Sequence, residues 1–137
     1  MKRGGFFYRT LLTLVGIQVL YGIYWALHDI SARLGLWPDP DQAEAFVTSL
    51  MAVQETFFFS HVVMNAVVFV LVWKRRWWAL PAFVLSFLLD RSDWVMMTGN
   101  VVFSGMVDVD SWALFSFALQ GAIIALLVIL VFEGRLR

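Results

Sequence analysis

The sequence contains no cysteine, and its charges balance. Ten basic and ten acidic side chains among 137 residues give a formal net charge of +0. Without cysteine, disulfides, iron–sulfur clusters and thiolate zinc sites are excluded. Without a basic excess, nucleic acid is not expected as a partner, since a nucleic-acid-binding face needs clustered positive charge. The sequence also has no glycine-rich phosphate loop and no serine-hydrolase elbow.

Apolar residues, by contrast, are abundant. They make up 61% of the chain, and the mean hydropathy is +0.80. Soluble domains are about 45–50% apolar. A small globule cannot hide such an excess from water, because much of its surface stays exposed. The composition therefore predicts an all-α integral membrane protein.

Four hydrophobic segments fill most of the chain, each close to the roughly 20 residues that a spanning helix requires. We expect residues 1–137 to form one domain, a four-helix transmembrane bundle with antiparallel neighbours. The spans are expected at about 6–27, 50–73, 77–98 and 112–132. The third is the weakest, because its uninterrupted apolar run, 77–89, is short and the span must carry Asp90, Arg91 and Asp93. The competing interpretation is a re-entrant third segment, which would place the termini on opposite sides.

The distribution of charge predicts the orientation. Eight of the ten basic residues lie on one side of a four-span arrangement: Lys2, Arg3, Arg9, Lys74, Arg75, Arg76, Arg135 and Arg137. Cytoplasmic loops carry the lysine and arginine excess. We therefore expect both termini to be cytoplasmic (N-in/C-in), in a bacterial cytoplasmic (inner) membrane.

Two features are expected on the outer side. Asp39 is placed as an N-cap, followed by Pro40 at the first helical position, so a helix begins near residue 40. We expect that helix to continue without a break to Trp73. Residues 101–109 follow a turn-like sequence and are apolar, which predicts an outer loop that lies on the membrane, covers a cavity or contacts a partner.

Charged residues inside the predicted spans form the main candidate site. A rise of about 1.5 Å per residue places one group in the outer half of the membrane: Glu55, Asp90, Arg91 and Asp93, with His28 and Asp29 above them. Arg91 is the expected partner of Glu55 or Asp90. Intramembrane charges face protein, water or a partner. Two interpretations compete: a structural ion-pair network, and a vestibule for an ion, a proton or a small polar ligand.

One face of the second span carries a further polar stripe of Gln54, His61 and Asn65. Because polar groups occupy several faces of this span, we expect it to be central in the bundle or in an oligomer. His61 lies near the midplane and is expected to bond across helices to Gln18 or Gln120. A single-histidine haem or pigment ligand is an alternative, whereas bis-histidine haem would need His28 at the same depth. No metal-ligand spacing is present.

The fourth span carries small residues on one face: Ala118, Gly121, Ala122 and Ala125. Small residues let helix backbones approach closely in membranes. We expect this face to pack within the bundle, with a seam between chains as the alternative. Gln120 points away from it.

Three functional hypotheses follow. The first is an accessory or assembly subunit of a larger membrane complex, because soluble domains and catalytic spacings are absent and residues 101–109 are apolar. The second is a homo-oligomeric channel or transporter that uses the polar residues of the second span. The third is a membrane-embedded enzyme acting on a lipid-like substrate. The expected partners are membrane lipid, including bound lipid, and other membrane subunits or copies of the chain; any cofactor is unknown.

Overall fold

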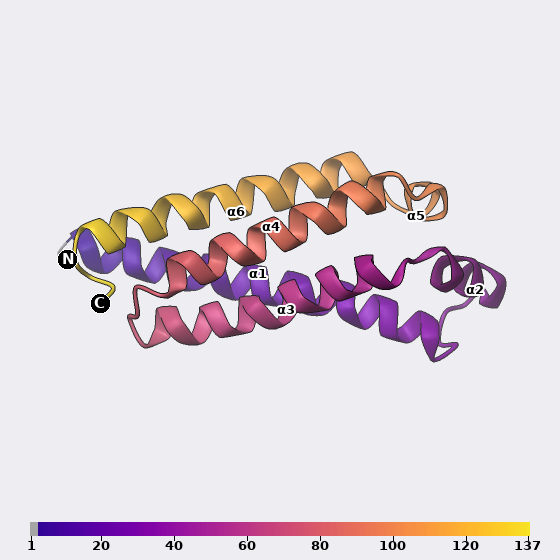
Figure 1. The fold of residues 1–137 in the computed structure, drawn as a ribbon, viewed down its shortest axis with the longest axis horizontal. Helices are drawn as coiled ribbons and strands as arrows, with labels where there is room; N and C mark the ends of the chain where they lie inside the picture. The colour runs from indigo at the N-terminus through magenta and orange to yellow at the C-terminus, as the bar shows by residue number, and fades with distance from the viewer. Residues whose placement is uncertain (1–2) are drawn as a thin grey trace.

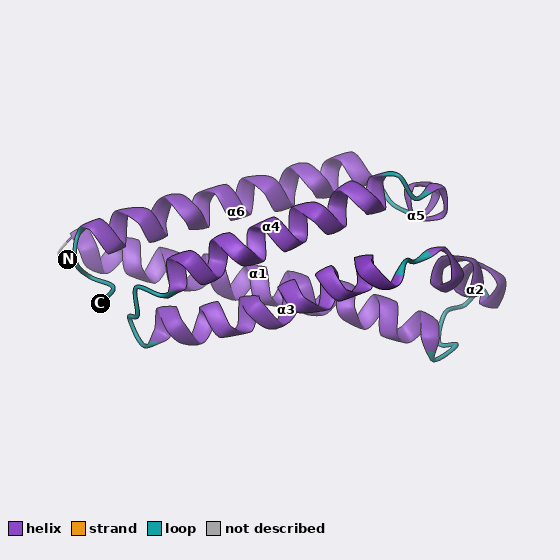
Figure 2. Cartoon of the chain, viewed as in Figure 1, coloured by secondary structure: helices purple, strands orange, loops and turns teal. Residues whose placement is uncertain are grey.

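The computed structural model describes residues 3–137, and every regular element in that range is a helix (Figure 2). The helices of this range are α1 (Arg3–Arg33), α2 (Pro40–Ser49), α3 (Ala52–Trp73), α4 (Ala79–Thr98), α5 (Val101–Met106) and α6 (Val109–Phe132). Lys2, one of the basic residues predicted to be cytoplasmic, lies outside the described residues.

The four long helices lie side by side, and the short helices α2 and α5 cover one end (Figure 1). Helix α3 packs against α4 and α1, and α6 packs against α1 and α4. The first turn of α1 and the last residues of the chain lie at the other end of the bundle, as does the α3–α4 connection (Figure 1). The long helices thus occupy the positions predicted from the hydrophobic segments.

Three of these helices are long and apolar enough to cross a membrane: Gly5–Arg33 within α1, Ala52–Trp73 and Val109–Phe132. They mark the chain as a membrane protein. Helix α4 falls outside this group because it carries Asp90, Arg91 and Asp93.

The interior is divided into layers along the bundle. The half near the termini is an apolar core to which all four long helices contribute, including Leu11, Val68, Phe83 and Ile123. The opposite end is a second cluster, rich in aromatic rings, around Phe46, Trp94 and Phe103. In α1 and α4 the buried polar residues lie between residues of these two clusters in the sequence, and in α3 they precede its residues of the apolar core. The bundle therefore holds a polar layer between two apolar ones.

The end of the bundle covered by α2 and α5 corrects the expectation of one continuous helix from residue 40 to Trp73. Helix α2 begins as predicted, since Asp39 accepts hydrogen bonds from the backbone N–H groups of Asp41 and Gln42 at 3.1 and 3.2 Å. It ends at Ser49, and extended backbone follows before α3. Ser49 is bonded locally to the Phe46 carbonyl at 2.7 Å and also accepts from Asn100 at 2.8 Å. Such side-chain bonds compete with a helix, and packing of α2 across the bundle end completes the break.

The segment 101–109 is also more regular than predicted. It begins with α5, which is capped by Asn100: its side-chain oxygen accepts from the N–H groups of Val102 and Phe103 at 3.0 and 3.2 Å. Phe103 is buried in the aromatic cluster. Of the roles considered for this apolar segment, the structure supports covering the interior.

The small-residue face of α6 does not pack within the chain, so that expectation is wrong. Its four members, Ala118, Gly121, Ala122 and Ala125, are all exposed. A side chain at Gly121 would meet no described atom within 4 Å. Helix α6 instead turns Ser116 and Gln120 inward, where both contact Asp90. A buried carboxylate is costly unless hydrogen-bond donors surround it, so the inward face of α6 carries these polar side chains rather than the small residues.

Candidate functional site

The polar layer contains ten buried polar or charged residues from all four long helices. They are Gln18, Asp29, Gln54, His61, Asn65, Ser86, Asp90, Asp93, Ser116 and Gln120. The sequence predicted the importance of most of them by depth alone. The structure shows which of them contact one another, and those contacts define two groups.

Asp90 is the centre of the first group. Its Oδ2 accepts hydrogen bonds from Gln120 Nε2 at 2.7 Å and from Arg91 Nε at 3.1 Å, and Ser116 Oγ lies 3.4 Å away. Its Oδ1 lies 3.3 Å from His61 Nε2. Asp90 is only 2% exposed. A carboxylate so deeply buried is stable only with such a set of partners. The predicted pairing of Arg91 with Asp90 is confirmed.

His61 is oriented by a chain of polar contacts within the same group. Asn65 Nδ2 lies 3.2 Å from His61 Nδ1, and Ser86 Oγ donates to Asn65 Oδ1 at 2.8 Å. Since an amide nitrogen only donates, Nδ1 is an acceptor and the proton of the neutral ring is on Nε2, facing Asp90. The expected polar contact of His61 across helices is confirmed, but its partner is Asp90 of α4 rather than Gln18 or Gln120, because a carboxylate is the stronger partner. With both ring nitrogens engaged, haem or pigment ligation by His61 would require these contacts to break.

The second group surrounds Arg33, at the C-terminal end of α1. Its Nε donates to Asp29 Oδ1 at 3.1 Å, and its Nη2 contacts the Glu55 carboxylate. Depth along the helices pairs Arg91 with Glu55 or Asp90, whereas in the structure the partner of Glu55 is Arg33. The sequence does contain a signal for the contact between Arg33 and Asp29, because residues four apart lie next to each other on one face of a helix. The predicted cluster is therefore divided between two ion-pair groups, and Asp93 and His28 form no ion pair with any residue that the structure describes.

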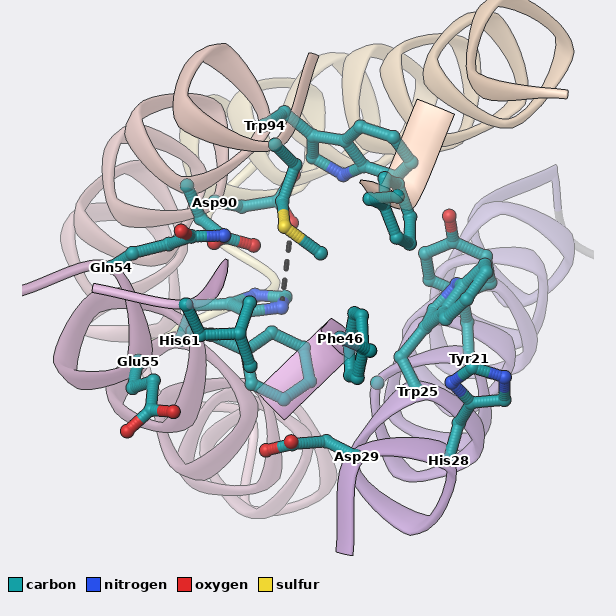
Figure 3. Close-up of a pocket in the computed structure, with 16 residues that line it drawn as sticks. Tyr21, Trp25, His28, Asp29, Phe46, Gln54, Glu55, His61, Asp90 and Trp94 are labelled. Atoms are coloured by element: carbon teal, nitrogen blue, oxygen red, sulfur yellow. Dashed lines mark ion pairs between the residues drawn. The ribbon is translucent and has the colours of Figure 1, made fainter. Parts of the chain in front are cut away.

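Both groups line one cavity of about 50 Å³ between the helices. Its acidic lining residues are Asp29, Glu55, Asp90 and Asp93. Figure 3 shows carboxylates and Gln54 on one side and the α1 residues Tyr21, Trp25 and His28 on the other. Arg91 lies outside the lining, behind Asp90. A cavity of about 10–15 Å³ is already enough to hold one water. This space therefore admits several waters or one small polar molecule.

Aromatic side chains form the rest of the wall and were missed by the sequence analysis as site residues. Trp25 and Phe103 meet edge to face at 5.8 Å, and Trp94 meets Phe103 at 6.2 Å. The Tyr21 hydroxyl and the Trp25 indole N–H are buried and have no hydrogen-bond partner among residues 3–137. Buried polar atoms normally have a partner. Both residues line the cavity, although these two polar atoms are themselves buried.

The charges around the cavity do not balance. Four carboxylates line it, and two arginines, Arg33 and Arg91, contact them. Asp93 is 6% exposed and forms no ion pair with any residue in the described part of the chain. A buried carboxylate without a counter-charge is stabilised by a proton or by a cation. The site is thus suited to a positively charged guest.

Comparisons with protein-family models, with curated proteins and with solved structures found no match, so the site is interpreted from its own chemistry. No group of three or more histidine, aspartate or glutamate side chains in residues 3–137 is arranged to hold a metal ion. The main chemical groups of the cavity lining are carboxylates and aromatic rings.

Proposed function

We propose that this protein is a small four-span transporter that binds an organic cation in the cavity between α1, α3 and α4. The observation that carries the proposal is the cavity lining: it has four carboxylates and a wall of aromatic rings, and only two arginines, both outside the lining, pair with those carboxylates. Carboxylates attract a cation, and the faces of tryptophan and tyrosine stabilise it further. A substituted ammonium or a guanidinium ion combines the charge and the apolar surface that such a lining suits.

The four-span topology, with both termini cytoplasmic, is part of this proposal. Helix α4 packs along α3 and α6, and its carboxylates Asp90 and Asp93 are buried rather than facing outward. Charged side chains that face protein rather than lipid do not prevent a helix from crossing the membrane, so α4 can be a span despite its three charged residues. The termini and the basic α3–α4 connection lie at one end of the bundle, as the excess of basic residues on the cytoplasmic side requires (Figure 1).

The size of the cavity limits the cation to a few heavy atoms. Tetramethylammonium and guanidinium are suitable probes because both are small and remain charged at any pH of interest. A cation in the cavity competes with a proton for the buried carboxylate of Asp93. Binding should therefore release protons, which is the chemical basis for exchanging a cation against protons across the membrane.

Calorimetric titration of the protein in nanodiscs with tetramethylammonium tests the proposal. Saturable binding is expected, and Asp93→Asn should weaken it about tenfold, which corresponds to loss of one contact to a charged group. Glu44→Gln is the matched control, since Glu44 is an exposed acid on α2 outside the cavity. Absence of saturable binding, or equal affinities in Asp93→Asn and Glu44→Gln, would exclude the cation site. A proton-release signal at binding would separate exchange from simple binding.

The accessory-subunit role predicted from the sequence is a second candidate, and the exposed small-residue face of α6 favours it. This face leaves room for another helix, because a side chain added at Gly121 would have no described neighbour within 4 Å. Native mass spectrometry after mild extraction tests this role. Gly121→Leu should release an associated chain, whereas Val63→Leu, at an exposed apolar position of α3, should not. A monomer in every sample would exclude this candidate.

A further inference from the structure

The end of the bundle opposite the cation cavity has a second hollow, of about 650 Å³. Five basic residues line it: Lys74, Arg75 and Arg76 from the α3–α4 connection, and Arg135 and Arg137 from the segment after α6. Glu133 is its only acidic lining residue in the described chain, and it pairs with Arg135 at 2.6 Å. The hollow therefore carries a strong positive excess that nothing in the cation site uses.

Backbone contacts fix the two basic segments to each other. The N–H of Arg137 donates to the Arg75 carbonyl at 2.7 Å, and the N–H of Trp77 donates to the Arg137 carbonyl at 3.3 Å. Leu136, between the two arginines, is 3% exposed and belongs to the apolar core. Gly134, with φ of +65°, provides the turn that brings the segment back. Residues about 60 positions apart are thus held in one arrangement independently of their charged side chains.

Arg75 is positioned with particular constraint. It is the one non-glycine residue of the described chain with positive φ, at 54°. Such a conformation is costly for a side chain and persists only where the surroundings hold it. Its guanidinium lies over the ring of Tyr8, 4.6 Å from the centroid, and the Tyr8 hydroxyl donates to the Val72 carbonyl at 3.2 Å. Tyr8 therefore presents Arg75 to the hollow in a defined orientation.

The depth of the hollow identifies the class of ligand. Trp73, Trp77 and Trp78 adjoin it in sequence and are exposed, and the last two stack at 4.2 Å. Tryptophans of this kind lie at the level of lipid headgroups. Five like charges gathered in one hollow repel one another until an anion joins them. At this depth the available anions are the phosphates of lipids in the same leaflet.

We propose that this hollow binds the phosphate groups of an anionic phospholipid in the cytoplasmic leaflet. The proposal rests on the four-span orientation given above but not on the cation site. Arginine forks suit phosphate oxygens, because two N–H groups bind one phosphate at once. The size of the hollow and its five cations favour a lipid with two phosphates, such as cardiolipin, over one with a single phosphate. A bound lipid here would clamp the α3–α4 connection to the end of α6.

Native mass spectrometry of delipidated protein, titrated with cardiolipin and with phosphatidylcholine, tests the proposal. Cardiolipin should bind more than tenfold more tightly. Arg137→Gln should weaken cardiolipin binding about fivefold, the effect of one basic residue at a membrane surface. Arg9→Gln is the matched control, because Arg9 is an exposed cation of α1 that does not line the hollow. It should change the affinity less than twofold.

Two further measurements make the test decisive. Circular dichroism should show nearly equal thermal unfolding of Arg137→Gln and the unchanged protein, since the backbone contacts of Arg137 do not involve its side chain and the one bond of that side chain, from Nε to the Gly134 carbonyl at 3.3 Å, is exposed. Inorganic pyrophosphate at millimolar concentration should not displace cardiolipin, because it lacks acyl chains. Equal losses in Arg137→Gln and Arg9→Gln would overturn the proposal in favour of a diffuse charge effect. Displacement by pyrophosphate would overturn it in favour of a soluble anion.

Discussion

His61 Nε2 lies 3.3 Å from Asp90 Oδ1 in the middle of the bundle, with both side chains almost fully buried. This contact joins α3 to α4, and through Asp90 it extends to Ser116 and Gln120 on α6. The same carboxylate borders the cavity in which we propose that a cation binds. Asp90 therefore serves both the stability of the bundle and the electrostatics of the site, and substitutions must separate the two roles.

Replacing Asp90 should destabilise the protein strongly. Asp90→Leu leaves Arg91 without its carboxylate partner and removes an acceptor from His61 and Gln120. Breaking a buried ion pair in this way costs about 3–5 kcal/mol. Thermal unfolding in detergent should show a large fall in midpoint. The free energy of unfolding of the exposed Glu44→Gln control should stay within about 0.5 kcal/mol of the unchanged protein. If Asp90→Leu were equally stable, the polar contacts of Asp90 would not stabilise the bundle.

The tautomer of His61 should be the one with its proton on Nε2. The nitrogen of the Asn65 amide faces Nδ1 at 3.2 Å, so Nδ1 must accept. Histidine-selective ¹⁵N NMR can read this directly, because the chain has two histidines and His28→Gln assigns the other. Asn65→Leu should let the ring exchange between tautomers. A proton found on Nδ1 in the unchanged protein would contradict the polar chain from Ser86 to Asp90.

Arg33 and Glu55 should affect cation binding in opposite directions. Arg33 neutralises carboxylates at the cavity, so Arg33→Gln should tighten tetramethylammonium binding, by about fivefold for a charge at this range. Glu55→Gln should weaken it. The Arg33–Glu55 pair is partly exposed, so Glu55→Gln should cost no more than about 1 kcal/mol of stability, whereas Arg33→Gln also removes the partner of the buried Asp29 and should cost more. Parallel titrations in nanodiscs check both signs, and a shift in the same direction for both variants would contradict the electrostatic account.

Labelling of introduced cysteines should establish the topology, and the absence of native cysteine makes the background clean. An impermeant maleimide applied from the outer side should label Glu44→Cys and Asp108→Cys but not Lys74→Cys or Arg135→Cys. If α4 only re-enters the membrane, Asp108 and Arg135 exchange sides. Labelling of Arg135→Cys from outside would therefore contradict the four-span arrangement.

The sequence was sufficient to place the long helices and the depth of most site residues. Hydrophobic length located α1, α3, α4 and α6, and counting along each helix placed Asp90 and Arg91 together in the polar layer. Whether all four helices cross the membrane stays a prediction. Depth arguments succeed because the rise per residue of a helix is fixed.

Rotation of each helix about its axis could not be predicted in the same way. Glu55 was assigned to Arg91 by depth, but it faces α1 and meets Arg33 instead. The small face of α6 was turned inward in the prediction, whereas Gln120 occupies that position because Asp90 requires a donor there. The break between α2 and α3 depends on Asn100, a residue some 50 positions away, and no local pattern encodes it. Contacts between distant residues decided each of these outcomes.

The most direct test of the cation site is the NMR signal of tryptophan side chains. In protein labelled with ¹⁵N-tryptophan, tetramethylammonium should shift the indole N–H resonance of Trp25, whose nitrogen is buried at the cavity without a described partner. Trp25→Phe assigns that resonance. Trp78, exposed at the far end of the bundle, is the internal control and should not move. A saturable shift confined to the cavity tryptophans is the predicted result. No shift at Trp25, or equal shifts at Trp25 and Trp78, would contradict the account.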